Sequence, residues 1–558
     1  MTGNRNLTWL RVPNRTVAAG FSLRGKDALV KGAATGAPVL LVALTASVVL
    51  GALLVSALPA GAQSGPRATS ETVAAAAAAD PQLPKGPVEP TWNSIRSSYK
   101  VPDWWRDAKF GIFMHWGLYA VPAHGSEWYA LHMYNNADII RWHREHFGPQ
   151  EKFGYKDFIP MFTAAKWDPD AWADLFKKSG AKFVVPTAEH HDGFSLWDSA
   201  YNQYNAKQMG PKRDLIADLG KAVRAKGLKF GVSNHSIEHF TFIRVNDSLK
   251  TNDLYDPQWA DFYSVADRDK PEALQKFLTL WVAKNFELID KYQPDLLWFD
   301  NGVNSRTFDP LKLKVAAYYY NRAKEWGKQV SLSTKDSAYL AGSILDFERM
   351  SRAPAELTDY PWQVDDPVLY RFGYTEDHPG IARPDGVVRN LINNVSKNGG
   401  LLLNISPRAD GTIPDDQQKL LLDIGKWLEV NGDAIYGTRP WTKYGEGSLP
   451  PRGTNAPPET VAAAPRAHVY RFTTKPAPSG VSGGDTLYAI ALGWPGDQAT
   501  ITSLATGSAG VGKITAVELL GHKGKLEFTQ DGTGLKVKMP ADKPCDYAYA
   551  LKITGLKL

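Results

Sequence analysis

The stretch Pro294-Asp295-Leu296-Leu297-Trp298-Phe299-Asp300 gives the clearest indication of the fold. Four consecutive apolar residues are typical of a parallel strand that is buried on both faces. The run ends in the carboxylate of Asp300, and Asn301-Gly302 follow at once. In parallel barrels the catalytic groups lie where a strand gives way to a loop. Asp300 therefore either faces a pocket or only begins a turn, and the pocket is favoured because the pattern recurs.

The pattern recurs between residues 92 and 436, where short apolar runs alternate with amphipathic segments that end at glycine. The seven expected strands are Phe110–His115, Phe183–Thr187, Leu228–Val232, Leu296–Phe299, Val330–Ser333, Ile344–Phe347 and Leu401–Ile405. The repeated order of strand and helix predicts parallel βα units. This number of strands suits a (β/α)8-type, TIM-like barrel. The alternative is a doubly wound open sheet, but no Gly-x-Gly-x-x-Gly motif follows a strand.

A different pattern begins after a Pro/Gly-rich connection at residues 445–465. Short alternating segments bounded by Gly, Pro or Asp predict an antiparallel β-sandwich. The expected strands are His468–Phe472, Asp485–Leu492, Ala499–Leu504, Ile514–Leu520, Leu526–Thr529, Leu535–Met539 and Asp546–Ile553. We therefore assign residues 92–445 to a catalytic barrel and residues 446–558 to a structural or accessory domain.

The first 62 residues have the layout of a signal peptide. A basic region precedes an uncharged apolar run at residues 39–58, which ends in Ala60-Gly61-Ala62. Cleavage there predicts a secreted, extracellular protein without a membrane partner. The run is about twenty residues long, so the alternative is a retained signal anchor. Residues 63–91 are rich in Ala and Pro and are expected to be a disordered linker.

Charge and cysteine content bear on nucleic-acid binding and on disulfide bonding. The formal net charge is +6, but six basic residues and one acid in the leader contribute +5, which leaves +1 for the rest. The basic balance therefore gives no argument for nucleic-acid binding. The single cysteine, Cys545, excludes an intramolecular disulfide, and its alternating surroundings favour a buried strand residue over a nucleophile.

Ionisable and aromatic residues follow the expected barrel strands. They occur in the segments His115-Trp116-Gly117, Ser126-Glu127-Trp128-Tyr129, Glu189-His190-His191-Asp192-Gly193 and Ser233-Asn234-His235, and at Asp300, Lys335 and Glu348. Active sites of barrels lie at this end of the strands, so these side chains are expected to converge. Some of the 18 tryptophans are expected to contact a flat, partly apolar ligand such as a sugar ring.

Two chemistries fit this set of residues. In the first, Asp300 attacks a sugar carbon while Glu348 protonates the leaving oxygen. In the second, His115, His190, His191 and Asp300 bind a metal for hydrolysis. The glycosidic chemistry is favoured, with no metal, because adjacent histidines tend to point apart and no His-x-His spacing occurs. No P-loop, Gly-x-Ser-x-Gly or dinucleotide motif is present, so no cofactor is expected.

Several segments resemble the α-L-fucosidases of glycoside hydrolase family 29, over about residues 92 to 558. The segments that carry the resemblance are 108–117 (AKFGIFMHWG), 126–129 (SEWY), 190–194 (HHDGF) with 197–199 (WDS), 298–300 (WFD), 398–404 (NGGLLLN), 440–441 (PW) and 488–495 (YAIALGWP).

The resemblance implies an exo-acting, retaining hydrolase that releases α-L-fucose from fucosylated oligosaccharides or glycoconjugates. Asp300 matches the nucleophile that forms a covalent fucosyl-enzyme. The acid/base position matches Glu348, with Glu356 on the same loop as the second candidate. Many members carry a tyrosine pair where residues 233–235 stand, so no tyrosine contact is expected. The positions that match the sugar-binding residues are His115, Glu127, Trp128, His190, His191 and Trp298.

A fucosylated glycan is therefore the expected partner, and no oligomeric state is predicted. A non-catalytic fucose-binding protein is the alternative from a different functional class, and a metal-dependent hydrolase on the same barrel is the other. Both carboxylate candidates follow strands, which favours the enzyme.

Overall fold

The computed structural model describes residues 68–335, 338–339, 342–350, 353–449, 467–476 and 485–556. The leader predicted for residues 1–62 lies outside this part of the chain, as does the start of the predicted linker. Within the part that is described, no helix is both long and apolar enough to cross a membrane.

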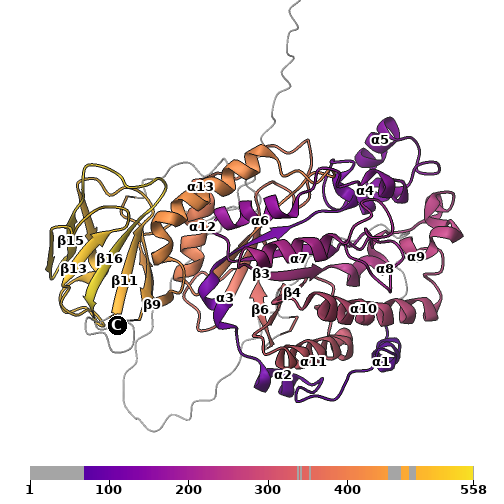
Figure 1. Ribbon diagram of the computed structural model, residues 1–558, viewed down its shortest axis with the longest axis horizontal. Helices are drawn as coiled ribbons and strands as arrows, with labels where there is room; N and C mark the ends of the chain where they lie inside the picture. The colour runs from indigo at the N-terminus through magenta and orange to yellow at the C-terminus, as the bar shows by residue number, and fades with distance from the viewer. Residues whose placement is uncertain are drawn as a thin grey trace, which may run out of the picture. The chain divides into compact units, whose positions relative to one another are not determined.

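Eight parallel strands form a closed barrel, which confirms the predicted fold and excludes the open sheet (Figure 1). They are β1 (Phe110–Met114), β2 (Phe183–Glu189), β3 (Lys229–Asn234), β4 (Leu296–Phe299), β5 (Ser331–Lys335), β6 (Ser343–Asp346), β7 (Trp362–Pro367) and β8 (Gly399–Ile405). Each strand pairs with the next along the chain, and β8 closes the barrel against β1, where Leu402 lies opposite Gly111.

Helices follow most of the strands and cover the outside of the barrel. The larger ones are α6 (Pro169–Lys178), α7 (Leu215–Ala225), α10 (Pro271–Tyr292), α11 (Asp309–Glu325), α12 (Pro384–Ser396) and α13 (Asp415–Asn431). The sequence sets their ends. The side chain of Asp168 caps the start of α6, and Gly180 follows its end with a φ of +87°. Asp214 and Gly227 do the same for α7.

Shorter helices lie before β1 and in the loops that follow barrel strands. They are α2 (Trp92–Ser98), α3 (Asp103–Ala108), α4 (Tyr129–Asn135), α5 (Ala137–His146), α8 (His239–Phe242) and α9 (Ala260–Tyr263). The helices α4 and α5 follow β1, and α8 and α9 follow β3, so both pairs belong to loops at the carboxyl ends of strands.

Strand β7 is the barrel strand that the sequence did not predict. Its residues Trp362-Gln363-Val364-Asp365-Asp366-Pro367 are all buried, although three of them are polar. Gln363 donates to Ser333 Oγ and to Asp346 Oδ2, at 3.1 and 2.6 Å. A buried strand whose polar groups bond inside the barrel has no continuous apolar run, so hydrophobic patterning misses it.

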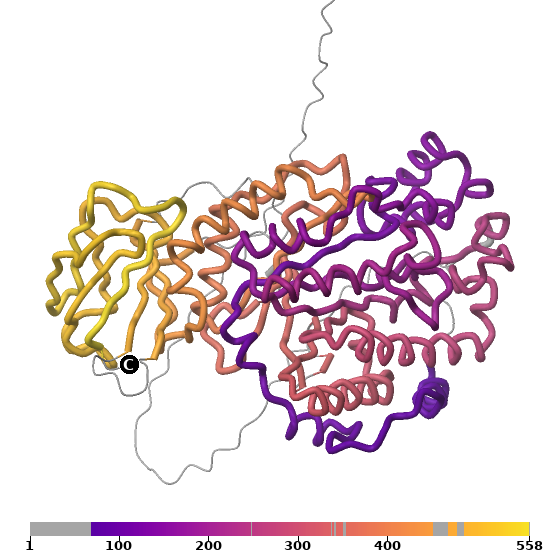
Figure 2. The backbone as a smooth tube through the Cα atoms, viewed as in Figure 1, coloured from indigo at the N-terminus to yellow at the C-terminus, as the bar shows by residue number. Residues whose placement is uncertain are grey.

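Part of the linker predicted at residues 63–91 is helical and not disordered. Residues Ser70–Ala78 form helix α1, whose Val73 and Ala76 are buried. Figure 2 shows this indigo segment against α10 and α11, and the Lys314 Nζ of α11 donates to the carbonyls of Ala77 and Ala79. The alanine run has high helix propensity, and the Thr69 side chain caps its first turn.

After the barrel, two antiparallel sheets form the predicted β-sandwich. The first has the order β13-β16-β11-β10-β9 and the second has β12-β15-β14. Their bounds are β9 (Arg439–Glu446), β10 (Tyr470–Lys475), β11 (Asp485–Ala491), β12 (Gln498–Ile501), β13 (Ala516–Leu519), β14 (Phe528–Asp531), β15 (Gly534–Lys538) and β16 (Tyr549–Leu556).

Two details of this second domain differ from expectation. Strand β9 precedes the expected boundary at residue 446, yet it pairs with β10, so the sheet begins earlier in the chain. Cys545 lies before β16 and is only partly buried, with Sγ 3.4 Å from the carbonyl oxygen of Ala548. The expectation of a buried strand cysteine is therefore wrong.

Candidate active site

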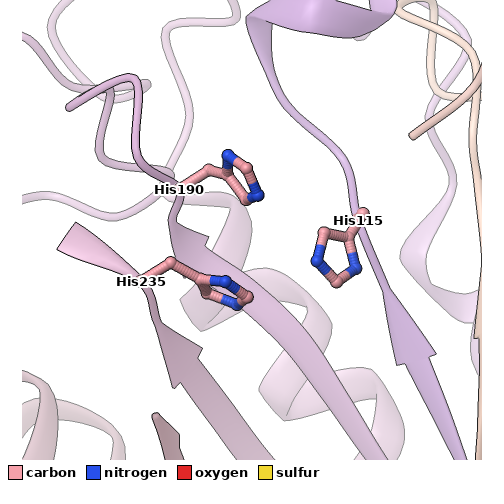
Figure 3. Close-up of side chains that lie close together, drawn as sticks. All are labelled: His115, His190 and His235. Carbon is pink, nitrogen blue, oxygen red and sulfur yellow. The ribbon is translucent and has the colours of Figure 1, made fainter. Parts of the chain in front are cut away.

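Polar side chains gather where the barrel strands end. Figure 3 shows His115, which follows β1, and His190 and His235, which follow β2 and β3, with their rings turned toward one another. The ring centroids lie 5.5 Å apart for His115 and His190, and 5.0 Å apart for His190 and His235. The predicted convergence of these residues is thus a feature of the structure.

Asp300 is the first residue after β4, and its carboxylate is surrounded by donors. Oδ2 lies 2.9 Å from Nδ1 of His235 and 3.4 Å from Nε2 of His191, and Oδ1 lies 2.7 Å from Nζ of Lys335. Burial alone would raise the pKa of Asp300. The Lys335 ammonium and the hydrogen bonds from the two histidines hold that pKa well below its usual range. Asp300 is therefore a carboxylate at neutral pH.

Lys335, the last residue of β5, joins Asp300 to Glu348. Its Nζ also lies 2.7 Å from Oε2 of Glu348, which begins the short 3₁₀ helix Glu348–Met350 after β6. Two contacts of 2.7 Å to one atom put Asp300 Oδ1 and Glu348 Oε2 no more than 5.4 Å apart. Burial lowers the pKa of Lys335, but the neighbouring carboxyl groups, Asp300 first among them, raise it well above its usual value.

Three of the histidines are held neutral. Burial is the largest cause that lowers the pKa of His115 and of His190 well below the usual value, and it lowers that of His235 to about 4. His191 differs: burial is the largest single influence and lowers its pKa, but the hydrogen bond and charge of Asp300, together with the charge of Glu238, raise the pKa above its usual value. Neutral imidazoles each offer one donor and one acceptor, which suits the recognition of hydroxyl groups.

The hydrogen bonds of these rings set their orientation. His115 Nδ1 lies 2.7 Å from Asn404 Oδ1 on β8, so it is bonded across the strands that close the barrel. Nδ1 of His190 is buried and has no hydrogen-bond partner among the described residues. A buried nitrogen without a partner costs free energy unless a ligand supplies the missing bond.

Glu127 and Trp128 come from the loop after β1. The Glu127 Oε2 accepts the backbone N–H groups of Phe372 and Gly373 at 3.1 and 3.0 Å, which ties this loop to the one after β7. The Trp128 side chain packs edge-on against His191 and is 38% exposed, so a ligand can reach its ring.

Trp298 lies deeper than the other predicted contact residues. It has no exposed surface, its Nε1 donates to Asp346 Oδ2 at 2.7 Å, and its ring packs against His235 with centroids 5.0 Å apart. Lys335 Nζ lies 5.4 Å from the ring centroid. Trp298 thus supports the residues that hold Asp300 from below.

The two acid/base candidates lie at different ends of the barrel. Glu348 shares an ammonium with Asp300, as described above. Glu356 lies 3.5 Å from the hydroxyl of Tyr444 in β9, on the segment that leads to the start of β7. Thr358 on this segment donates to the carbonyl of Lys397, which precedes β8, so Glu356 belongs to the amino-terminal end of the strands. The structure therefore brings only Glu348 to Asp300.

Two overlapping groups of side chains have the spacing of metal ligands. They are His115, His190 and His235, and His191, His235 and Asp300. His235 belongs to both, but its Nδ1 bonds to Asp300 and its Nε2 to Ser233 Oγ at 2.9 Å, which leaves no lone pair for a cation. The Lys335 ammonium also contacts Oδ1 of Asp300, where a cation would have to bind. These residues fit hydrogen bonding to a ligand better than they fit a metal ion.

Four polar residues of the site were missed in the sequence, and one of them, Glu238, has its Oε2 3.5 Å from Nδ1 of His191. Asn404 orients His115, and Asp346 and Asp365 lie beneath Trp298 and Lys335. The usable signal was the alternation of Gln363 and Asp365 along one strand, since residues two apart point to the same face.

Comparison with known proteins assigns both parts of the chain. Residues 75–433 match the family model described as alpha-L-fucosidase, and residues 467–554 match that of the alpha-L-fucosidase C-terminal domain. The chain is 32% identical to the tissue alpha-L-fucosidase of Rattus norvegicus over 485 residues, which cover 83% of this chain and 92% of the relative.

Solved structures agree with this assignment. The Thermotoga maritima alpha-fucosidase in complex with fucose is 31% identical, with a TM-score of 0.64, and the match covers 83% of this chain and 99% of that one. The same enzyme in complex with a mechanism-based inhibitor is 30% identical, with a TM-score of 0.65 and the same coverage.

Proposed function

The chain belongs to the α-L-fucosidase family of glycosidases, and we propose that it releases α-L-fucose from fucosylated oligosaccharides or glycoconjugates with retention of configuration. The observation that carries the retaining mechanism is the Lys335 ammonium shared by Asp300 and Glu348. It holds the two carboxyl oxygens within 5.4 Å, and retaining glycosidases have carboxyl groups about 5 to 5.5 Å apart. Inverting enzymes need a wider gap, because a water molecule must fit between sugar and base.

In the first step the Asp300 carboxylate attacks the anomeric carbon and forms a fucosyl ester. Glu348 donates its proton to the glycosidic oxygen, so the leaving group departs as an alcohol. The low pKa of Asp300 keeps the nucleophile ionised, and the partial exposure of Glu348 lets the leaving group reach solvent on its side.

In the second step Glu348, now a carboxylate, takes a proton from water, and the water attacks the ester. The negative charge thus moves from Asp300 to Glu348 during the first step and back during the second. Because Lys335 contacts both groups, its ammonium faces one negative charge at every stage. This fixed countercharge needs no rearrangement during reaction, which is the advantage of a preorganised site.

The fucose would be bound by hydrogen-bonding side chains and by one apolar wall. His115, His190, His191 and Glu127 supply polar groups, and the unpartnered Nδ1 of His190 is a ready contact for a hydroxyl. The exposed Trp128 ring supplies an apolar surface for the methyl group or ring face of the sugar, while the buried Trp298 supports the site from below. A site with such polar groups rejects analogues that lack the matching hydroxyl.

The test is the stereochemistry of the first product. NMR spectra of an aryl α-L-fucoside digest should show α-L-fucose first, with the β anomer appearing only by later mutarotation. The β anomer as first product would overturn the retaining mechanism. Binding of fucose without any turnover would instead support a fucose-binding protein.

We also propose that the protein is exported, on the basis of the basic and apolar residues of its first 62 positions. Sequencing the amino terminus of the protein from culture medium tests this. A start after residue 62 supports cleavage, and retention in the membrane fraction supports an anchor.

A further inference from the structure

Two buried aspartates lie directly below the site, and the proposed mechanism gives neither of them a role. Asp346 ends β6 and Asp365 lies in β7, and both have 1% exposure or less. Charged groups are rarely buried in this way unless they are paired.

Burial raises the pKa of Asp346, but its carboxyl oxygens accept three N–H groups, which favours the carboxylate form. Its Oδ2 accepts Trp298 Nε1 at 2.7 Å and Gln363 Nε2 at 2.6 Å, and its Oδ1 accepts the backbone N–H of Asp365 at 2.9 Å. The pairing of β6 with β7 ends at Asp346, and there its side chain accepts the backbone N–H group that a strand carbonyl would otherwise accept. The same carboxyl group also fixes the ring of Trp298.

Asp365 has the opposite surroundings. No described N–H or O–H group donates to either of its carboxyl oxygens. Burial and then the charge of Asp346 raise its pKa well above the usual value, although Lys335 lowers it. The hydrogen bond open to Asp365 is through a proton of its own, donated to Asp346. The raised pKa and the lack of any donor to its oxygens both favour the protonated, neutral form of Asp365.

The titratable groups that face Asp365 come from three elements. They are Asp346 from β6, Lys335 from β5 and Glu348 from the 3₁₀ helix after β6. On its other side β8 places the apolar Leu402 opposite Asp365 in register. An ionised Asp365 would thus compete with Asp300 and Glu348 for the single ammonium of Lys335.

We propose that Asp346 and Asp365 form a buried positioning pair that shares one proton, in which Asp346 fixes Trp298 and the neutral Asp365 leaves Lys335 to Asp300 and Glu348. Neither residue contacts the reacting atoms, and both act through Lys335 and Trp298. The inference rests on the proposed function, because the pair serves the two carboxyl groups that carry the reaction.

The test applies the same substitution to two neighbouring residues. Asp365→Asn keeps a neutral donor beside Asp346, so kcat/KM for an aryl α-L-fucoside should stay within about threefold of the wild type, and its pH profile should not move. Asp346→Asn supplies one acceptor for three donors and adds an N–H group. It should lower kcat about a hundredfold through misplacement of the site, with a smaller change in KM.

The pH profile separates positioning from mere structural support. In Asp346→Asn a displaced Lys335 no longer lowers the pKa of Asp300, so the acidic limb of kcat/KM should move up by about one pH unit. If this variant does not fold, Trp298→Phe removes the N–H donor and should move the limb in the same direction. Asp295→Asn, a buried aspartate at the start of β4, is the matched control and should lower stability without moving the limb.

A spectroscopic measurement tests the shared proton without any activity. Wild-type protein labelled with ¹³C at its aspartate carboxyls should show, at neutral pH, the infrared carbonyl band of a protonated acid, and Asp365→Asn should lose it. Three results would each overturn the proposal. They are the absence of the band in the wild type, equal losses of activity in the two asparagine variants, and an unmoved acidic limb in both Asp346→Asn and Trp298→Phe. An inactive wild type that shows the band would count against the proposed function alone.

Discussion

Nζ of Lys335 lies 2.7 Å from Oδ1 of Asp300, at the ends of the adjacent strands β5 and β4. A lysine this deeply buried keeps its charge because acidic groups surround it, and its charge in turn keeps the pKa of Asp300 low. The two residues therefore stabilise each other's ionised forms.

Substitution Lys335→Gln should move the acidic limb of kcat/KM to higher pH. The ammonium lowers the pKa of Asp300, so its loss raises that pKa by about one unit or more, and the nucleophile protonates earlier as pH falls. Rates measured across the acidic range with an aryl α-L-fucoside check this. The matched control is Lys229→Gln, which removes a lysine paired with Asp295 at the other end of the barrel. An unchanged limb in Lys335→Gln would contradict the role of the ammonium.

Substitution Asp300→Ala should reduce hydrolysis of an aryl α-L-fucoside by about 10⁴-fold or more, because it removes the carboxylate proposed to form the ester. The protein should stay folded, since the removed side chain bonds within the site and not within the apolar core. Circular dichroism and thermal melting provide the folding control. A folded variant that keeps a tenth of the activity would rule out Asp300 as the nucleophile.

Substitution Glu348→Ala should depend strongly on the leaving group. Substrates with basic leaving groups need the acid most and should lose about 10²- to 10⁴-fold, while activated aryl fucosides lose less. Added azide should restore turnover of the fucosyl-enzyme and yield a fucosyl azide. The matched variant Glu356→Ala should show neither effect, because Glu356 lies by Tyr444 at the other end of the barrel. Azide rescue of Glu356→Ala alone would reverse the assignment.

The free energy of unfolding should fall as pH drops from 6.5 towards 4. Burial lowers the pKa values of His235 and His239 from 6.5 to about 4, so in this window the unfolded chain binds protons that the folded chain refuses. Each such histidine adds a slope of about 1.4 kcal/mol per pH unit. Urea unfolding at a series of pH values measures it, and His239→Gln should flatten the slope. Stability that rises as pH falls through the window would contradict this reading.

Treatment with a chelating agent should leave the activity unchanged, and added zinc should not increase it. Both nitrogens of His235, which belongs to both histidine groups, are already bonded to Ser233 and Asp300. The assay needs a chelator at a concentration that inactivates a known zinc hydrolase as a control. Loss of activity that returns with one particular metal would support the metal-dependent alternative.

Much of the barrel and of its site could be predicted from the sequence. An apolar run that is followed by an ionisable residue, such as Leu296–Phe299 before Asp300, predicts both a strand and the position of its functional residue. The convergence of residues after β1, β2, β3 and β4 follows from the parallel topology alone. The family motifs then gave these positions their expected roles.

The remainder depended on contacts between residues far apart in the chain. Strand β7 was not predicted because its polar residues Gln363 and Asp365 are buried in the barrel, where Gln363 donates to Asp346, so the hydrophobicity of the strand is low. The choice between Glu348 and Glu356 needed the path of the loop between β6 and β7. Helix α1 was mistaken for linker because an alanine run does not reveal that Val73 packs against the barrel helices.

The bond between His115 and Asn404 spans a sequence separation of 289 residues, across the seam where β8 meets β1. A nascent chain that has left the ribosome only as far as β7 already contains Asp300 and Glu348, but it lacks the Asn404 side chain that bonds to His115. The proposed sugar-binding site is therefore completed last, when strand β8 pairs with β1. Truncated products of this gene should bind no fucose even where their strands have formed, and closing so long a loop should make folding slow.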